Sequence, residues 1–358
     1  MSQQVDTLII GQGICGTFLS LQLERTGSSH LVIDEPRPYS ASRIAAGLIN
    51  PVTGRRLVTT WMIDELLASA REAYGQLGAT LGNSFLSETS VTDFFPSAQM
   101  RLAFLDRLAQ DGSYLNLPAD EGRWNPCFHY ELGYGSISPC YLVDMQGLLA
   151  AARKRMLGQG ILLEQRFEKE QLQIGTDQVR YGDLIARRVI FCDGIESFTS
   201  QWFSRLPFAP NKGEVLIVDI PELKGHTGTE TSIFKKGISL VPWQDGLYWV
   251  GSSYEWSFTT EAPTTAFRER TELLLKNWVR LPFKVLDHLA SVRPATLERR
   301  PFVGFHPLYP PVGILNGMGT KGCSLAPYFA RQLAANITTG SPIRADADVQ
   351  RFTRLLSR

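Results

Sequence analysis

The sequence lacks the features that mark membrane-spanning, secreted and strongly charged proteins. No apolar run approaches the roughly 18 residues that a membrane-spanning helix needs. The N-terminal segment "MSQQVDTLIIG" has no basic region and no long apolar stretch, so we expect no signal peptide. Lys and Arg number 36 and Asp and Glu number 35, a formal net charge of +1 that provides no overall attraction for nucleic acid or a membrane surface.

Paired cysteines and metal-ligand spacings are also missing. The five cysteines form no C-x-x-C pair: they are Cys15, Cys127, Cys140, Cys192 and Cys323. An odd, scattered set in a chain of 358 residues is typical of reduced thiols in a cytoplasmic protein, which is the localisation we predict. No spacing of side chains suits a metal, and no Ser-His-Asp arrangement occurs, so we predict neither a metal site nor a hydrolase triad.

What the sequence does contain is a glycine turn near its start. A short apolar run leads into a G-x-G-x-x-G motif, formed by Gly11, Gly13 and Gly16. The apolar pattern of a helix follows, and a second apolar run at 30–33 ends directly before Asp34. Strand, glycine turn, helix, strand and acidic residue, in this order, predict a dinucleotide-binding unit.

Each part of this unit has a physical task. Gly11 permits a tight turn, Gly13 lets a pyrophosphate approach the backbone, and Gly16 lets helix and strand pack closely. The N-terminus of the helix offers free N–H groups and a positive dipole end to the phosphates. Asp34 can accept hydrogen bonds from a ribose, and an acidic residue here argues against the 2′-phosphate of NADP. The motif leaves FAD and NAD as alternatives.

A second glycine turn lies near the C-terminus. It follows an apolar run, contains Gly317, Gly319 and Gly322, and precedes a helical pattern. We expect this helix to begin near Ser324, with Pro327 in its first turn. FAD carries negative charge at the pyrophosphate and, when reduced, at the N1–C2=O edge of the flavin ring. The FAD hypothesis assigns the first glycine turn to the pyrophosphate and the second to the flavin ring. The alternative is that the second turn has a purely structural role.

These segments together resemble the D-amino-acid oxidase (DAO) superfamily of FAD oxidoreductases, which includes glycine oxidase and sarcosine oxidase. Besides the first turn with Asp34, the similarity involves "SRIAAGLINP", "VIFCDG", "KGEVLIVDIP", "SLVPWQDGLYWVGSSYE", "RPATLERRPFVG" and "GMGTKG". Lys-Gly-Glu stands where the family has Arg-Gly-Gln. The segment "GTKGCSLAP" is similar to the flavin domain of the enzyme that modifies the wobble uridine of bacterial tRNA.

The resemblance implies an α/β fold, α+β overall, in which a Rossmann-like FAD-binding domain is joined to a discontinuous second domain on a mixed, largely antiparallel sheet. The FAD-binding domain is expected to comprise 1–82, 141–206 and 290–358, and the substrate domain 83–140 and 207–289. The pattern from Trp61 to Leu77 predicts an amphipathic helix outside the nucleotide core.

The resemblance also implies a reaction and its side chains. The family dehydrogenates a C–N bond: the amine carbon delivers a hydride equivalent to flavin N5, the imine is hydrolysed, and oxygen or another acceptor reoxidises the flavin. Arg293 matches an arginine that grips the substrate carboxylate, and an ion pair with Glu298 or another acidic residue is the structural alternative. Lys321 is expected at the flavin N1 edge or in solvent, and Tyr254 over the substrate or packed against other residues.

The residues expected to hold FAD come from all of these motifs. They are Gly11, Gly13, Ile14, Cys15, Gly16, Asp34, Glu35, Ser42, Ala45, Ala46, Gly47, Leu48, Asp193, Gly194, Gly317, Met318, Gly319, Thr320, Lys321 and Gly322. Relatives similar to sarcosine oxidase attach the flavin through a cysteine near position 291, where this chain has Ser291. We therefore expect FAD to be bound non-covalently.

Three functions stay open on this evidence. The first is an FAD oxidoreductase acting on a small amine or amino acid. The second is the same chemistry on the carboxymethylaminomethyl side chain of a tRNA wobble uridine, favoured by basic pairs at 55–56, 235–236 and 299–300 but opposed by the near-neutral charge. The third is a flavin-binding protein without turnover.

Overall fold

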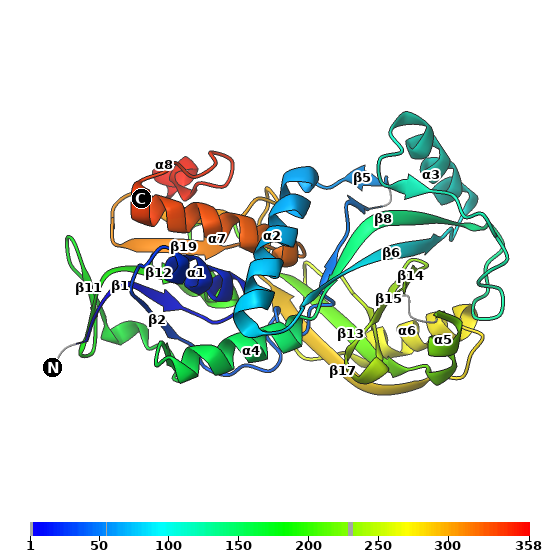
Figure 1. The fold of residues 1–358 in the computed structure, drawn as a ribbon, viewed down its shortest axis with the longest axis horizontal. Helices are drawn as coiled ribbons and strands as arrows, with labels where there is room; N and C mark the ends of the chain where they lie inside the picture. The colour runs from blue at the N-terminus through cyan, green and yellow to red at the C-terminus, as the bar shows by residue number, and fades with distance from the viewer. Residues whose placement is uncertain (1–2, 55, 228–231) are drawn as a thin grey trace.

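The computed structural model describes residues 3–54, 56–227 and 232–358. Two β-sheets follow one another along the long axis of the molecule, and helices cover their faces (Figure 1). The expected fold class is confirmed, because one sheet is built on parallel strands of the Rossmann type and the other is mixed and largely antiparallel.

The first sheet has a parallel centre with antiparallel additions. Its strands among the described residues are β1 (Gln3–Ile10), β2 (His30–Ile33), β9 (Leu162–Leu163), β10 (Leu172–Ile174), β11 (Val179–Tyr181), β12 (Leu184–Phe191), β18 (Phe302–Phe305) and β19 (Val312–Asn316). β2, β1, β12 and β19 are parallel neighbours in this order. Their carboxyl ends therefore meet at one edge of the sheet, which is where ligands bind in such folds.

Alternation along β1 divides the packing between the two faces of this sheet. Ile9 belongs to the core that includes residues of α1 and α7, whereas Leu8 and Ile10 belong to the core on the opposite face. All three side chains are almost fully buried. A strand buried on both faces reads as a continuous apolar run, which explains why "LII" lacks the alternation of a surface strand.

The second sheet is longer and carries the other end of the molecule. Its strands among the described residues are β3 (Leu48–Ile49), β6 (Leu86–Phe94), β7 (Leu115–Asn116), β8 (Tyr134–Val143), β13 (Asn211–Asp219), β14 (Ser232–Lys235), β15 (Ser239–Pro242), β16 (Tyr248–Gly251) and β17 (Lys284–Arg293). The path runs β17-β13-β16-β15-β14-β6-β8-β3, and only the β14–β6 contact is parallel among the described pairs. A short hairpin, β4 (Val52–Thr53) and β5 (Val58–Thr59), stands apart.

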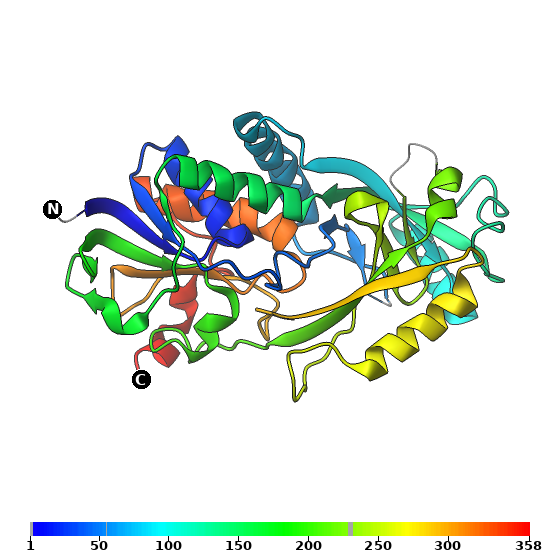
Figure 2. The ribbon, with the colours of Figure 1, turned by 90° about the horizontal axis from the view of Figure 1, so that it is seen from below.

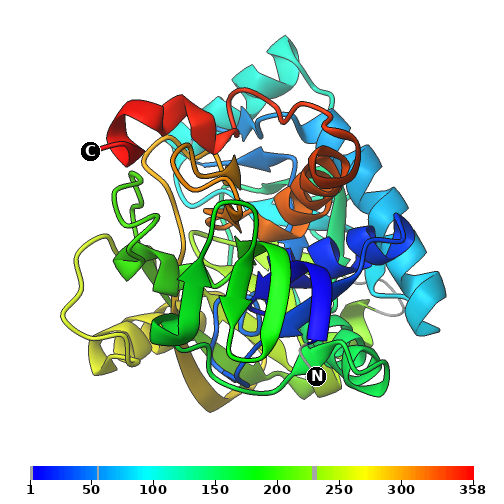
Figure 3. The same ribbon diagram turned by 90° about the vertical axis from the view of Figure 1, so that its left-hand side faces the viewer.

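The helices are grouped around the two sheets. They are α1 (Ile14–Arg25), α2 (Ile63–Leu81), α3 (Ala98–Gln110), α4 (Met145–Gly158), α5 (Pro221–Thr227), α6 (Thr265–Trp278), α7 (Gly322–Thr339) and α8 (Thr353–Leu356). α1, α4 and α7 cover one face of the first sheet (Figure 2), and α7 packs beside α1 (Figure 3).

α2 differs from its predicted position. It begins at Ile63 rather than Trp61 and continues to Leu81. It packs against α7, and its Tyr74 lies in the same core as Phe18 and Phe329. The expectation of a helix outside the nucleotide core is therefore wrong, because the apolar face of α2 packs into the core that α1 and α7 share.

α7 also begins earlier than predicted. Its first residue is Gly322 and its N-cap is Lys321, so Pro327 lies in the second turn and not in the first. Proline has no N–H, and the carbonyl four residues before it, that of Cys323, loses its helical partner. The Tyr74 hydroxyl donates a hydrogen bond to this carbonyl at 2.9 Å. A contact from α2 thus makes the proline compatible with the helix.

The division into two domains stays a prediction. Strands of the first sheet come from 3–33, 162–191 and 302–316, and strands of the second from 48–143 and 211–293. β8 and β17 each extend across an expected boundary, at 140/141 and 289/290.

Candidate active site

A large cavity lies where the carboxyl edge of the first sheet meets the second sheet. Its volume is about 1790 Å³, and its walls include residues of both sheets. Ordinary small-molecule pockets measure about 300–1,000 Å³. The cavity therefore has room for a large cofactor and a substrate together.

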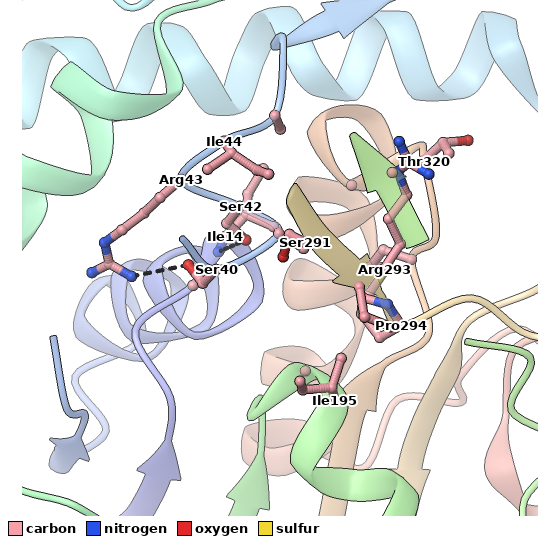
Figure 4. Close-up of a pocket in the computed structure, with 18 of the residues that line it drawn as sticks. Ile14, Ser40, Ser42, Arg43, Ile44, Ile195, Ser291, Arg293, Pro294 and Thr320 are labelled. Atoms are coloured by element: carbon pink, nitrogen blue, oxygen red, sulfur yellow. Dashed lines mark hydrogen bonds between the residues drawn. The ribbon is translucent and has the colours of Figure 1, made fainter. Parts of the chain in front are cut away.

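The first glycine turn forms one wall of this cavity. Gly11 has φ +101°, and a Cβ there would lie 2.6 Å from the Cys192 carbonyl oxygen. A Cβ on Gly16 would lie 1.9 Å from the Gly11 carbonyl oxygen, so only glycine lets α1 approach the turn this closely. The Ile14 N–H at the start of α1 donates to the Ser42 hydroxyl at 3.2 Å (Figure 4). The N-cap residue of α1, Gly13, has no side chain to cap the helix, so apart from this bond the start of α1 meets the cavity without a side-chain cap.

Asp34 stands at the end of β2 in the same wall, but it is not free. Its Oδ1 accepts a hydrogen bond from the Gln12 N–H at 2.8 Å, and its Oδ2 lies 2.6 Å from Nη1 of Arg153 on α4. Arg43 is a second, more distant cation at 3.9 Å. Gln12, fully buried, accepts from both arginines through Oε1. The network fixes the carboxylate so that remaining lone pairs can meet a ribose.

The second glycine turn brings another helix N-terminus to the cavity. Gly317 and Gly319 have φ +79° and +57°, a region that favours glycine. Among the described residues, the backbone N–H groups of Thr320, Gly322 and Cys323 have no acceptor. These donors and the positive end of α7 are suited to a negatively charged group.

A buried polar cluster ties the second turn to the end of β12. The side-chain amide of Asn316 donates to the Gly194 carbonyl at 2.8 Å and to the Ser197 hydroxyl at 3.1 Å, and its Oδ1 accepts from the Gly317 N–H. Ser197 donates to Asp193, whose pKa is raised to about 7 because burial disfavours its charge. Two cavity-lining turns are thereby held at a fixed separation.

The loop that contains the predicted FAD-binding residues 42–48 is attached to the second sheet. Gly47 has φ +81°, and a Cβ there would lie 2.0 Å from the Val143 carbonyl oxygen. The Trp249 indole donates to the Ile44 carbonyl at 2.9 Å, and Leu48 begins β3, which pairs with β8. The other predicted loop residues, Ala45 and Ala46, also line the cavity.

This arrangement fits FAD. Two glycine turns place two helix N-termini on one cavity, and an acidic residue stands at the end of β2. Gly11 and Gly16 show by their contacts that a side chain cannot occupy the turn. With the exception of Gly16 and Gly317, every residue predicted to hold FAD lines the cavity, including Glu35 and Met318. Those two glycines act through the backbone geometry of the turns.

Arg293, at the end of β17, carries a charge without a carboxylate partner. Its Nη1 donates to Asn211 Oδ1 at 2.6 Å, and its Nη2 donates to Ser252 Oγ at 2.7 Å (Figure 4 shows its place on the cavity wall). No carboxylate of the described residues lies within 4.0 Å of the guanidinium. The predicted alternative partner, Glu298, instead pairs with Arg351 at 3.3 Å. A cation held this way in a cavity favours an anionic ligand.

Gly213 explains how the Arg293 side chain fits against the sheet. A Cβ on Gly213 would lie 1.8 Å from Nη2 of Arg293. The guanidinium therefore rests directly over the backbone of β13, and burial lowers the pKa of Arg293. The glycine of Lys-Gly-Glu is required here by the arginine, which neither residue indicates when read alone.

The other two predicted catalytic residues also line the cavity. Among the described residues, Lys321 has no ion-pair or hydrogen-bond partner for its ammonium group. Its pKa is lowered by burial and then by Arg299 and Arg300. Tyr254 is half exposed, with its ring 5.8 Å from the Arg293 guanidinium carbon and edge-on to Trp256.

Several site residues were missed in the sequence. Arg153 is 119 positions from Asp34, and Asn211 is 82 positions from Arg293. No local pattern links residues so far apart, because helix and strand packing alone brings them together. The segment "KGE" did contain a signal for the position of Arg293. A glycine inside a strand often marks a place where another group lies close to the backbone.

Metal sites and membrane-spanning helices are not seen in the described part of the chain. Among residues 3–54, 56–227 and 232–358, no group of three His, Cys, Asp or Glu side chains could hold a metal. No helix in this part of the chain is long and apolar enough to cross a membrane. The five cysteines are all buried and unpaired.

Comparison with known proteins agrees with this geometry. The sequence model of the family described as FAD dependent oxidoreductase (DAO) matches residues 6–336. The fold is similar to that of glycine oxidase from Geobacillus kaustophilus, with a TM-score of 0.77 and 17% identity over 96% of each chain. It is also similar to iminodiacetate oxidase from Chelativorans sp. BNC1, with a TM-score of 0.73 and 20% identity over 95% of this chain and 96% of that one. L-proline dehydrogenase from P. horikoshii has a TM-score of 0.76 and 17% identity over 99% of both chains.

Proposed function

Because the chain belongs to the DAO family of FAD-dependent oxidoreductases, we propose that it oxidises a carbon–nitrogen bond of an amine or amino acid that bears a carboxylate. The observation that carries this proposal is the unpaired guanidinium of Arg293 on the wall of the cavity. Glycine oxidase and iminodiacetate oxidase, two of the similar structures, are named for substrates of this kind.

The side chains divide the work between cofactor and substrate. When bound, FAD supplies two-electron oxidation by accepting a hydride equivalent at its flavin ring. The N–H groups at the start of α1, with Ser42, would hold the pyrophosphate, and Asp34 would hold the ribose. The turn from Gly317 to Gly322 and the loop at Ala45–Leu48 would hold the ring. The imine product is then hydrolysed by water.

Arg293 orients the substrate for this reaction. Hydrogen bonds to Asn211 and Ser252 hold its guanidinium in place, and its Nε–H has no acceptor among the described residues. A carboxylate can take Nε–H and share Nη2–H, the side-on form of a bidentate contact. Holding the carboxylate at one end fixes the direction of the carbon that is oxidised.

Lys321 and the start of α7 would balance charge that develops on the cofactor. The ammonium group has no carboxylate partner in the described part of the chain, and the backbone donors of Thr320, Gly322 and Cys323 are likewise free. A cation beside a helix N-terminus favours an anionic neighbour.

Anaerobic reduction of the flavin tests the proposal. We expect carboxylate-bearing primary or secondary amines to bleach the flavin absorbance of the holoenzyme and release the amine or the carbonyl product. The matched decarboxylated amines should react much less. If hydroxy acids reduce the flavin while no amine of the panel does, oxidation of a carbon–nitrogen bond is excluded.

Arg293→Met should separate the clamp from the cofactor site. We expect the dissociation constant of a carboxylate-bearing amine to rise on the order of tenfold or more, since the variant removes a hydrogen bond between charged groups. FAD content should stay that of the wild type. An equal loss for the decarboxylated analogue would assign Arg293 to structure rather than to carboxylate binding.

A second candidate is the wobble-uridine side chain of tRNA, and one observation favours it. Arg299 and Arg300 have no carboxylate partner among the described residues and lie close enough to lower the pKa of Lys321. The other basic pairs give no support: Lys235 pairs with Asp93, and position 55 lies outside the described residues. Flavin reduction by hypomodified tRNA, and its loss in Arg299→Ala/Arg300→Ala, would establish this function.

A further inference from the structure

A polar pair stands on the cavity wall at some distance from the Arg293 clamp. Lys235, on β14, lines the cavity, and its Nζ lies 2.7 Å from Oδ2 of Asp93 on β6. The Asp93 side chain is 6% exposed and that of Lys235 is 26% exposed. Lys235 is thus the more accessible member of the pair, and it is the one that lines the cavity. Nothing in the proposed chemistry uses this pair.

The register of the second sheet aligns the pair with the substrate clamp. Cross-strand partners run Leu289, Val215, Gly251, Ser239, Lys235 and Asp93, so their side chains project from the same face. All of them except Asp93 line the cavity. Gly213, which lies under the Arg293 guanidinium, is two residues from Val215 on β13.

Small residues line the sheet surface between the Arg293 clamp and Lys235. Gly251 and Ser239 occupy the positions between Val215 and Lys235, and a Cβ on Gly251 would lie 2.8 Å from Val215 Cγ1. Three inter-strand steps of about 4.8 Å separate Val215 from Lys235, so this groove spans about 14 Å of sheet. A substrate held at Arg293 can extend along it.

The chemistry of the far end selects a particular group. An ammonium group has three N–H donors, and Asp93 takes one of them. The other two have no acceptor among the described residues, and Ser239 is the cross-strand neighbour of Lys235 on β15. Because Asp93 already balances the charge of Lys235, a neutral acceptor is favoured over a second carboxylate.

We propose that Lys235, supported by Asp93 and Ser239, forms a distal subsite that binds a neutral carbonyl or carboxamide oxygen of an elongated substrate whose carboxylate is held by Arg293. This inference rests on the proposed function, because it assumes that Arg293 holds the carboxylate. It narrows the substrate class to amino acids or N-substituted amino acids with an acceptor at the end of an extended chain.

Calorimetric titration of the FAD-loaded enzyme with unreactive carboxylates tests the subsite. Suberamate, 8-methylnonanoate and suberate share a carboxylate and chain length and differ in the far group: carboxamide, its apolar isostere, and a second carboxylate. We expect suberamate to bind at least about tenfold more tightly than 8-methylnonanoate, the factor that 1.4 kcal/mol represents. Suberate should bind more weakly than suberamate.

Variants assign the preference to the pair. Lys235→Met should abolish the advantage of suberamate, while Lys236→Met should keep it, because Lys236 donates instead to the His129 carbonyl at 2.7 Å. Lys235→Met leaves Asp93 without a partner. Lys235→Met/Asp93→Leu replaces the whole ion pair by apolar groups, an exchange that proteins often tolerate.

The outcomes distinguish this inference from the proposed function. Equal affinity for suberamate and its isostere, tighter binding of suberate, or a preference that survives in the double variant overturns the distal subsite. Binding of all three ligands that is unaffected by Arg293→Met overturns the carboxylate clamp itself. A preference that requires both Lys235 and Arg293 supports both.

Discussion

At the scale of single residues, the geometry of Asp34 depends on a cation that the motif does not contain. Arg153 reaches from α4 and holds Oδ2 at 2.6 Å, and it also pairs with Glu164. Asp34 is only 12% exposed in its side chain, so its orientation is set by these contacts rather than by water. If Asp34 holds a cofactor ribose, as proposed, its carboxylate would not have to reorient when the cofactor binds.

Arg153→Met should therefore weaken FAD binding. Loss of a charge-assisted contact contributes on the order of 1.5–3 kcal/mol, so we expect the FAD dissociation constant to rise roughly tenfold or more. Arg155→Met is the matched control: it lies on the same helix and pairs with Glu24 at 2.6 Å, away from Asp34. Fluorescence titration of both apoproteins with FAD measures the two dissociation constants. Equal constants for the two variants would show that Arg153 does not act through Asp34.

Asp193 gives a pH dependence of stability. Burial raises its pKa to about 7 from an ordinary value of 3.8, so between these values the unfolded chain ionises while the folded chain keeps the proton. Stability is then lost as pH rises, by on the order of 4 kcal/mol across the interval at about 1.36 kcal/mol per pH unit. Below the ordinary pKa both states are protonated and the group has no effect.

Asp193→Asn should remove this dependence. We expect the variant to gain stability relative to wild type when pH is raised from 5 to about 8. Urea unfolding of both proteins, stripped of FAD so that cofactor affinity does not enter, measures the difference. A constant difference across this range would mean that Asp193 is ionised throughout.

At the scale of elements, α7 depends on α2. Pro327 removes one hydrogen bond from the second turn of α7, and the Tyr74 hydroxyl satisfies the carbonyl of Cys323. Tyr74 is 1% exposed and also packs edge-on against Phe18 at 5.1 Å. The contact from α2 thus stabilises the first turns of α7, whose start lies at the cavity.

Tyr74→Phe tests this support. The variant keeps the ring and leaves a buried carbonyl unsatisfied, which costs about 1–3 kcal/mol. Tyr328→Phe is the control, since that hydroxyl bonds to the exposed Glu65 carboxylate, which water can solvate in its place. Urea unfolding should show the larger loss for Tyr74→Phe. Equal losses in the two variants would show that the hydrogen bond from Tyr74 to the Cys323 carbonyl does not stabilise α7.

At the scale of the whole molecule, the cavity joins the two sheets, so a cofactor there contacts both. The first sheet supplies the two glycine turns, and the second supplies Arg293 and the far groove wall. Ser291 also lines the cavity, and its hydroxyl cannot form the thioether that a cysteine would. Binding at such a junction stabilises the folded chain without a covalent bond.

FAD should accordingly be released into the supernatant by acid or heat precipitation. In a separate measurement, added FAD should raise the unfolding temperature of the apoprotein. A ligand at 100 times its dissociation constant adds about 2.7 kcal/mol to the free energy of unfolding. Absorbance of the supernatant and a thermal scan measure the two effects. Flavin that stays with the pellet would contradict non-covalent binding.

The sequence by itself determined the parts of this protein whose signal is local. Glycine spacing, short buried strands and the residue directly after a strand predicted both turns and Asp34, because a turn is defined by neighbours in the chain. Resemblance added Arg293 and the mixed second sheet. Position along a helix was less certain, and α7 begins at Gly322 rather than near Ser324.

Only the tertiary structure decided which distant groups meet. It paired Asp34 with Arg153, placed Gly213 under Arg293, gave Glu298 to Arg351 and brought α2 onto α7. It also placed Lys235 between Ser239 and Asp93 on the cavity wall through strand register. These contacts depend on how strands order and helices pack, and residues so far apart along the chain carry no local pattern that records such a meeting.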